Sequence, residues 1–185
     1  PIPRYRDIRR PIERVGSFAG NTWLAESQHV LTIWVELQDR MTLAAFAAAI
    51  GHPYVALGVD VETDDRWLEL DYGDLDGTSV FDVPSSTWVQ WRADLDWAPP
   101  GGESHAALGE RVRSACEDLL AEAAGSEVVV VTHVSPIKAA LAWALGVGDE
   151  IAWRCFVAPA SVLCIAVGPG GPTVRSFNDV AHLGA

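Results

Sequence analysis

Long apolar runs are missing from this sequence of 185 residues. The continuously apolar stretch Val128–Val131 has four residues, and the Ala-rich stretch Ala44–Ile50 is also far shorter than the roughly 20 residues that span a bilayer. The first residues are rich in Arg and Pro and lack the apolar segment of a signal peptide. We therefore expect a cytoplasmic protein with no membrane partner. The chain opens at Pro1 rather than Met, so residues before it are expected to be missing.

Cysteine is scarce. The three cysteines are Cys116, Cys155 and Cys164, and they form neither a CxxC pair nor a metal-ligand spacing. An odd number of cysteines with apolar neighbours is typical of reduced thiols in a cytosolic core, and it argues against a disulfide framework. We expect no metal site and no cofactor.

Basic residues are also few, with 13 Lys and Arg against 25 Asp and Glu, for a net charge of −12. This balance argues against nucleic acid as a partner. The basic residues are nevertheless concentrated at the start of the chain, where five arginines fall within fourteen residues: Arg4, Arg6, Arg9, Arg10 and Arg14. Two interpretations stay open: a solvated basic arm, or an arginine that meets a phosphate.

The patterns that are present predict one α/β domain over residues 1–185, in which residues 1–40 are atypical. A hydrophobic content of 49% argues against disorder. Helices are expected over Met41–Ile50, within Trp88–Trp97, from a Ser104 cap to about Ala124 and from Pro136 to Leu145, where Gly146 ends the helix. The tryptophans at 88, 91 and 97 are expected to pack in the core rather than to form an aromatic binding surface. Strands are expected over Val30–Val35, Val55–Val61, Val128–Thr132, Val162–Val167 and Thr173–Phe177, the last two joined by the turn Gly168–Pro172, and Trp67–Asp76 reads as a loop. Alternation of strands and helices around a buried strand predicts an α/β sandwich.

The strongest chemical pattern is Val131-Thr132-His133-Val134-Ser135-Pro136. A histidine here follows a buried strand and precedes a helix, and ligands of open α/β sheets bind where strands end. The start of the helix directs N–H groups and its dipole to the same place, which favours an anion. We therefore expect His133 to lie in an anion site.

Three ordered motifs resemble the histidine phosphatase (phosphoglycerate-mutase-like) superfamily. VVVVTHVSPIKAALAWALG, residues 128–146, is similar to its second-histidine motif. Residues 67–77, WLELDYGDLDG, are similar to the L-R-E-x-x-F-G-x-W-E-G segment, and residues 99–104, PPGGES, match the P-x-G-E-S turn. The end of the chain, VRSFNDVAHL, resembles the α-ribazole phosphatase branch.

This resemblance implies a three-layer α/β/α sandwich with a mostly parallel central sheet. It also implies two-step phosphoryl transfer to water from a small phosphorylated metabolite, through a phosphohistidine. Glu69 would be the general acid and His133 a catalytic phosphate ligand. The remaining phosphate-binding residues would be Arg6, Arg40, Val134 and Ser135.

The pattern departs from the family at the nucleophile, because the sequence contains no Arg-His-Gly. Gly16–Thr22 resembles the segment that normally follows that motif, and counting back places Asp7 where the nucleophile belongs. A truncated or garbled N-terminal third, a degenerate member and a pocket turned to other chemistry stay open. We expect an impaired phosphomonoesterase, with a non-catalytic phosphate-ligand or partner-binding domain as the alternative.

Prolines before Gly16 also argue against a central strand there. We therefore expect either a missing central strand or its replacement by another segment, for which Leu31–Val35 is the best candidate. Either case should leave a weakened core and extra exposed apolar surface around Val128–Val131.

Overall fold

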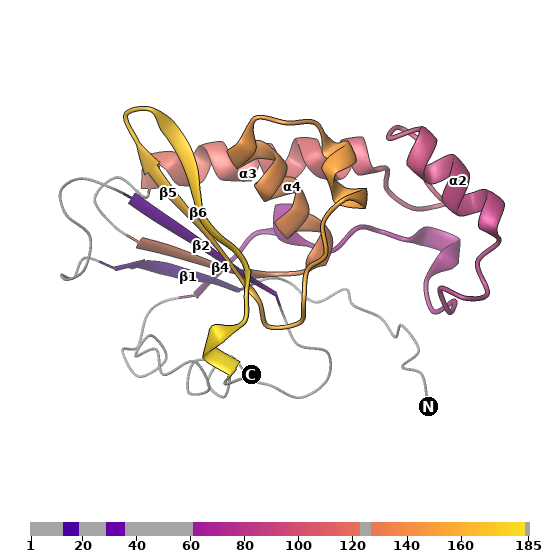
Figure 1. Ribbon diagram of the computed structural model, residues 1–185, viewed down its shortest axis with the longest axis horizontal. Coiled ribbons are helices and arrows are strands. Elements are labelled where there is room, and N and C mark those ends of the chain that lie inside the picture. Colours follow the sequence, from indigo (N-terminus) through magenta and orange to yellow (C-terminus); the bar gives the residue numbers. More distant parts are fainter. Residues whose placement is uncertain (1–12, 19–28, 36–60, 123–126, 184–185) are drawn as a thin grey trace.

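The computed structural model describes residues 13–18, 29–35, 61–122 and 127–183. In this part of the chain, six strands form one sheet in the order β3-β1-β4-β2-β5-β6 (Figure 1). The strands are β1 (Glu13–Phe18), β2 (His29–Val35), β3 (Val61–Thr63), β4 (Glu127–Thr132), β5 (Val162–Gly168) and β6 (Gly171–Asp179). The predicted helix at Met41–Ile50 and nearly all of the predicted strand at Val55–Val61 lie outside the described residues.

The directions of the strands differ from the expected mostly parallel sheet. Only β2 and β4 run parallel among the described strands, with Val30 opposite Glu127 and Val35 opposite Thr132. The other four pairings are antiparallel. The prediction of a mostly parallel sheet is therefore wrong for this part of the chain. A run such as VVVVT reports burial on both faces, but it carries no information on the direction of the neighbouring strands.

The helical layer lies on one face of this sheet. Helices α3 (His105–Glu122) and α4 (Val134–Leu145) pack side by side there, and α2 (Ser85–Ala93) lies beyond them (Figure 1). Among the described residues there is no second helical layer, so the expected three-layer arrangement is not visible in them.

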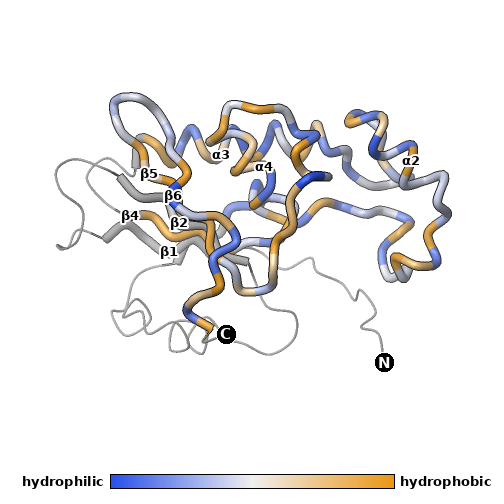
Figure 2. The backbone as a smooth tube through the Cα atoms, in the orientation of Figure 1, coloured by the Kyte–Doolittle hydropathy of each residue, from blue (hydrophilic) through white to orange (hydrophobic). Residues whose placement is uncertain are grey.

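Strand β4 lies inside the sheet, between β1 and β2. The hydrophobic colour of β4 is visible in Figure 2. Val128 and Val130 are buried in the main core, which contradicts the expectation of exposed apolar surface there, while Val129 and Val131 are half-buried. Strand β2 is also internal, because it pairs with both β4 and β5. The expectation that Leu31–Val35 supplies an inner strand is confirmed.

Local sequence explains where the two long helices begin and end. The Ser104 hydroxyl accepts a hydrogen bond from the N–H of Ala107 (3.1 Å), which is the cap expected for α3. Helix α4 ends at Gly146, whose φ of 64° lies in the left-handed region that glycine adopts easily. Helix α4 begins at Val134, two residues before the predicted start at Pro136. Proline is tolerated there because the first turn of a helix has no internal partners for its N–H groups.

Short 3-10 turns connect the remaining elements: η2 (Asp65–Trp67), η3 (Gly73–Leu75), η4 (Asp149–Trp153) and η5 (Ala181–Leu183). The acidic loop that holds η3 packs closely on the turn before α3. The N–H of Asp74 donates to the carbonyl of Pro100 (2.9 Å), and the N–H of Glu103 donates to the carbonyl of Asp71 (2.8 Å). Gly73, with φ of 52°, leaves no room for a side chain, because a Cβ there would lie 2.3 Å from the Pro100 carbonyl oxygen. The two matched loop motifs therefore form one packed unit.

Candidate functional site

The site begins where β4 passes into α4. Thr132 ends β4, and His133 is the extended N-cap residue of α4, with φ of −115°. Both residues are buried. Val134 and Ser135 are the first two residues of α4, so their positions at the positive end of the helix dipole agree with an anion site.

Glu69 reaches the same place from the acidic loop. Its carboxylate accepts a hydrogen bond from the N–H of Ser135, at 3.2 Å to Oε1 and 3.4 Å to Oε2. Oε1 also accepts from the N–H of Leu70, at 2.7 Å. A carboxylate thus lies against the first turn of α4, two residues from His133. The structure brings together Glu69, Val134 and Ser135 beside His133.

Thr132 fixes the loop that carries Glu69. Its hydroxyl donates to the carbonyl oxygen of Trp67 at 2.6 Å, in a fully buried position. The strand end that precedes His133 is therefore connected directly to the segment two residues before Glu69. This contact explains why the residue before His133 is a threonine.

Arg111 on α3 fixes the same loop from the other side, and sequence analysis missed it. Its guanidinium donates to both carboxylate oxygens of Glu103, each at 2.7 Å. It also donates to the carbonyl oxygens of Arg66 (2.7 Å) and Glu69 (3.3 Å). The available signal was the glutamate of the turn motif, followed eight residues later by an arginine in the second turn of the helix. Arg111 touches the backbone of Glu69 and acts as a positioning residue.

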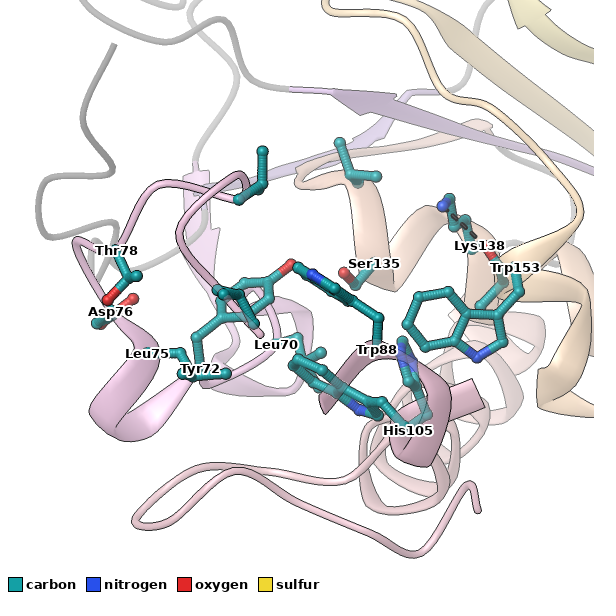
Figure 3. A pocket seen from close by; sticks show the side chains of 15 residues that line it. Leu70, Tyr72, Leu75, Asp76, Thr78, Trp88, His105, Ser135, Lys138 and Trp153 are labelled. Carbon is teal, nitrogen blue, oxygen red and sulfur yellow. Dashed lines mark hydrogen bonds between the residues drawn. The ribbon is translucent and has the colours of Figure 1, made fainter. Parts of the chain in front are cut away.

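A pocket opens next to the first turn of α4. Its cavity volume is about 130 Å³, and its wall includes Val134 and Ser135. Aromatic side chains form another part of the wall, and Figure 3 shows three of them, Tyr72, Trp88 and Trp153, around the space. Two basic groups also line it, His105 and Lys138. The tryptophans of residues 88–97 were expected to pack in the core. Trp91 is 1% exposed and Trp88 is half-buried, and both also line the pocket.

His105 is electrically neutral near pH 7. Burial, together with the nearby Lys138 ammonium, lowers its pKa to about 4. Its ring contacts those of Trp153 (centroids 4.8 Å apart) and Trp91 (5.7 Å). His105 therefore contributes an uncharged aromatic surface to the pocket.

The remaining predicted site residues, Arg6 and Arg40, lie outside the described residues, as does Asp7. No group of three His, Cys, Asp or Glu side chains is placed to bind a metal ion within the described part of the chain. In that same part, no helix is long and apolar enough to cross a membrane.

Comparison with known proteins now identifies the class. The profile of the histidine phosphatase superfamily (branch 1) matches residues 40–180, which is most of the chain. The chain belongs to the histidine phosphatase superfamily.

Particular relatives differ in how much of their length they share. A bifunctional protein of Mycobacterium tuberculosis is 34% identical over 133 residues, or 69% of this chain, but the match spans only 36% of that protein. Phosphoserine phosphatase 1 of Hydrogenobacter thermophilus is 28% identical over all of this chain and 88% of its own length. The fold is similar to that of a phosphoserine phosphatase from Entamoeba histolytica in complex with phosphoserine. That similarity has a TM-score of 0.69 at 15% identity, over 83% of this chain and 98% of the other.

Proposed function

We propose that this domain is a phosphomonoesterase of the histidine phosphatase type that acts on a small phosphorylated metabolite, with turnover far below that of members that carry Arg-His-Gly. The carboxylate on the N–H of Ser135 is the observation that carries this proposal. The first turn of α4 already holds an anionic group, and a phosphoryl group needs the same donors. We also propose that residues 1–185 form a single domain and that the protein is cytoplasmic.

The proposed roles follow from this geometry. The N–H groups of Val134 and Ser135, with His133, bind the phosphoryl oxygens, and Arg6 or Arg40 adds positive charge. Glu69, in its protonated form, moves from the helix terminus to the ester oxygen and donates its proton as the P–O bond to the alcohol breaks. A water molecule forms the new bond to phosphorus and releases one proton to solvent. Fixed donors around the equatorial oxygens supply much of the catalysis in phosphoryl transfer.

Relatives support a small substrate of this class. Matches include phosphoserine phosphatase 1 and a glucosyl-3-phosphoglycerate phosphatase of Mycolicibacterium vanbaalenii, 31% identical over 66% of this chain and 56% of its own length. Each name describes a phosphomonoester with a small polar alcohol.

The second candidate function is a non-catalytic phosphate-ligand or partner-binding domain. The absence of Arg-His-Gly from these 185 residues favours it. Removing a nucleophile that acts within a catalytic unit normally eliminates most of the rate and leaves binding in place.

Turnover of p-nitrophenyl phosphate and binding of inorganic phosphate, measured on the same preparation, test the proposal. We expect phosphate to bind, and we expect turnover far below the ordinary range of roughly 1–10³ per second. Ordinary turnover would show that another nucleophile operates. Phosphate binding without any turnover above the buffer rate would favour the non-catalytic phosphate-ligand domain. Absence of phosphate binding would contradict both the phosphomonoesterase and the phosphate-ligand domain.

Glu69→Gln provides the sharper form of this experiment. Loss of the negative charge beside the helix terminus should strengthen phosphate binding at pH 7, by about two- to fivefold for a helix-terminus charge effect of roughly 0.3–1 kcal/mol. The same substitution should reduce any residual turnover, because the amide cannot donate the proton as an acid does. Asp74→Asn is the matched control, since Asp74 is exposed in the same loop, and it should change neither quantity.

A further inference from the structure

The pocket and the proposed phosphate site share one wall. Val134 and Ser135 form the first turn of α4, where the phosphoryl group is proposed to bind, and both also line the pocket. The alcohol of an ester bound there can therefore extend into this pocket. The walls of the pocket then define which alcohol is accepted.

Those walls are flat, apolar and held in place by one central ring. Trp91 contacts Trp88 in a stacked arrangement, with centroids 5.8 Å apart and planes at 12°. It meets Tyr72 edge-on at 5.8 Å and Trp153 edge-on at 6.2 Å. Trp91 is buried and also lines the pocket, and it packs against the half-buried rings of Tyr72, Trp88 and Trp153. Such surfaces favour another ring in a stacked or edge-to-face contact.

The charges around these rings indicate whether the alcohol of the substrate is neutral or cationic. Aromatic boxes bind quaternary ammonium groups through cation–π contacts. Here the guanidinium of Arg92 already lies over the Trp153 ring, 5.4 Å from its centroid. The Lys138 ammonium also lines the pocket, and it donates to the carbonyl of Ala152 at 2.8 Å. Asp76 lies at the end opposite Trp153 (Figure 3). A third cation among these rings would be repelled by the two already there, so an uncharged ring fits better.

The geometry points to a phosphomonoester whose alcohol carries one aromatic ring as the substrate class of this domain, with Trp88, Trp153 and Tyr72 as specificity-determining residues. This inference rests on the proposed function. The cavity volume of about 130 Å³ is close to the roughly 150 Å³ of an apolar cavity that takes up benzene. One ring fills the pocket, whereas a small polar alcohol leaves its apolar walls without a partner.

Three non-hydrolysable phosphonates test this on the chain as it exists. Methylphosphonate, benzylphosphonate and 2-(trimethylammonio)ethylphosphonate are titrated separately, with calorimetric or tryptophan-fluorescence detection. We expect benzylphosphonate to bind about 10- to 100-fold more tightly than methylphosphonate, as burial of one phenyl ring provides. Equal affinities for these two would overturn the inference and leave the proposed function intact. Tightest binding of the trimethylammonium compound would overturn it in favour of a cationic alcohol, whereas failure of phosphate and all phosphonates to bind would remove the proposed function itself.

Trp88→Ala locates the effect, with Trp143→Ala as its matched control. Trp143 lies on α4 away from the pocket, where its indole N–H donates to Glu117 at 2.6 Å. We expect the benzyl-to-methyl affinity ratio to fall at least about fivefold in the Trp88 variant and to stay unchanged in the Trp143 variant. An unchanged ratio in a folded Trp88 variant would overturn the assignment of the pocket. If the alanine variant does not fold, Trp88→Leu, which keeps an apolar side chain over Trp91, serves in its place.

Discussion

Thr132 shows how a single side chain can connect a strand end to a distant loop. Its hydroxyl reaches the carbonyl oxygen of Trp67 across 65 positions in the sequence, and both residues are inaccessible to solvent. A buried carbonyl without a partner loses its hydration and gains nothing in return. The residue before His133 therefore has a role in holding Glu69 in place.

We predict that Thr132→Val lowers the free energy of unfolding by about 1–3 kcal/mol, because it keeps the shape and leaves the Trp67 carbonyl unpaired. Thr132→Ser keeps the hydroxyl and is the control. Urea denaturation of the three proteins, with equal m-values, measures the difference. A valine variant at least as stable as the serine variant would show that this hydrogen bond contributes nothing.

His105 makes stability depend on pH. Burial lowers its pKa in the folded state to about 4, below the ordinary value of 6.5. Between these values the unfolded chain binds more protons than the folded one, so acid favours unfolding. We predict that the contribution of neutral His105 to the free energy of unfolding is fully present above pH 6.5. This contribution, on the order of 3 kcal/mol, should disappear as the pH falls to about 4. The difference between the pH profiles of the free energy of unfolding for the protein and for His105→Phe isolates this contribution from the carboxylates. Parallel profiles would contradict it.

At the scale of elements, α3 and the loop before it behave as one unit around Arg111. The turn motif supplies Glu103, the helix supplies the arginine eight residues later, and the loop supplies two carbonyl oxygens. The partners are half-buried, so the contact is shielded from solvent more than an ordinary surface ion pair.

We predict that Arg111→Gln destabilises the protein by about 2–4 kcal/mol, because it leaves Glu103 and two carbonyl oxygens without their donor. The same substitution at Arg113, two residues later on α3, removes a more exposed pair with Asp149 and should cost no more than about 1 kcal/mol. Thermal and urea unfolding compare the two variants. If Glu69 depends on this positioning, phosphate affinity should also change in the Arg111 variant only.

Local sequence predicted the elements better than it predicted their arrangement. The caps at Ser104 and Gly146 depend on a few neighbouring residues, and both were predicted correctly. The predicted turn Gly168–Pro172 contains the two-residue connection of the antiparallel β5–β6 hairpin, and so short a connection permits only antiparallel strands. The direction of β1 against β4 and the contacts of Arg111 depend on residues far apart in the sequence, where no local pattern applies. The aromatic pocket was missed for the same reason, because its rings come from four separate segments.

At the scale of the whole molecule, β4 is the strand on which both the core and the site depend. It is paired on both edges, with β1 and with β2, and its buried side chains face the helical layer. Among the strands that the structure describes, β6 lies at an edge and pairs only with β5. Amides paired inside a sheet exchange through larger openings than those at an edge.

We predict that the amides of residues 128–131 are among the slowest of the chain in native-state hydrogen exchange, and that they exchange only when the protein unfolds as a whole. Their opening free energy should therefore follow global stability in urea, whereas that of β6 should reach a plateau at a lower value. We expect the opening free energy of the β4 amides to exceed that of the β6 amides by about 1.4 kcal/mol or more, which corresponds to about tenfold slower exchange. The Thr132→Val variant offers a direct check, because a change in global stability must appear in full in the exchange of β4 and only in part in that of β6. Exchange of β4 as fast as that of β6 would mean that β1 or β2 does not protect it in solution, and the site at its end would then lack a rigid support.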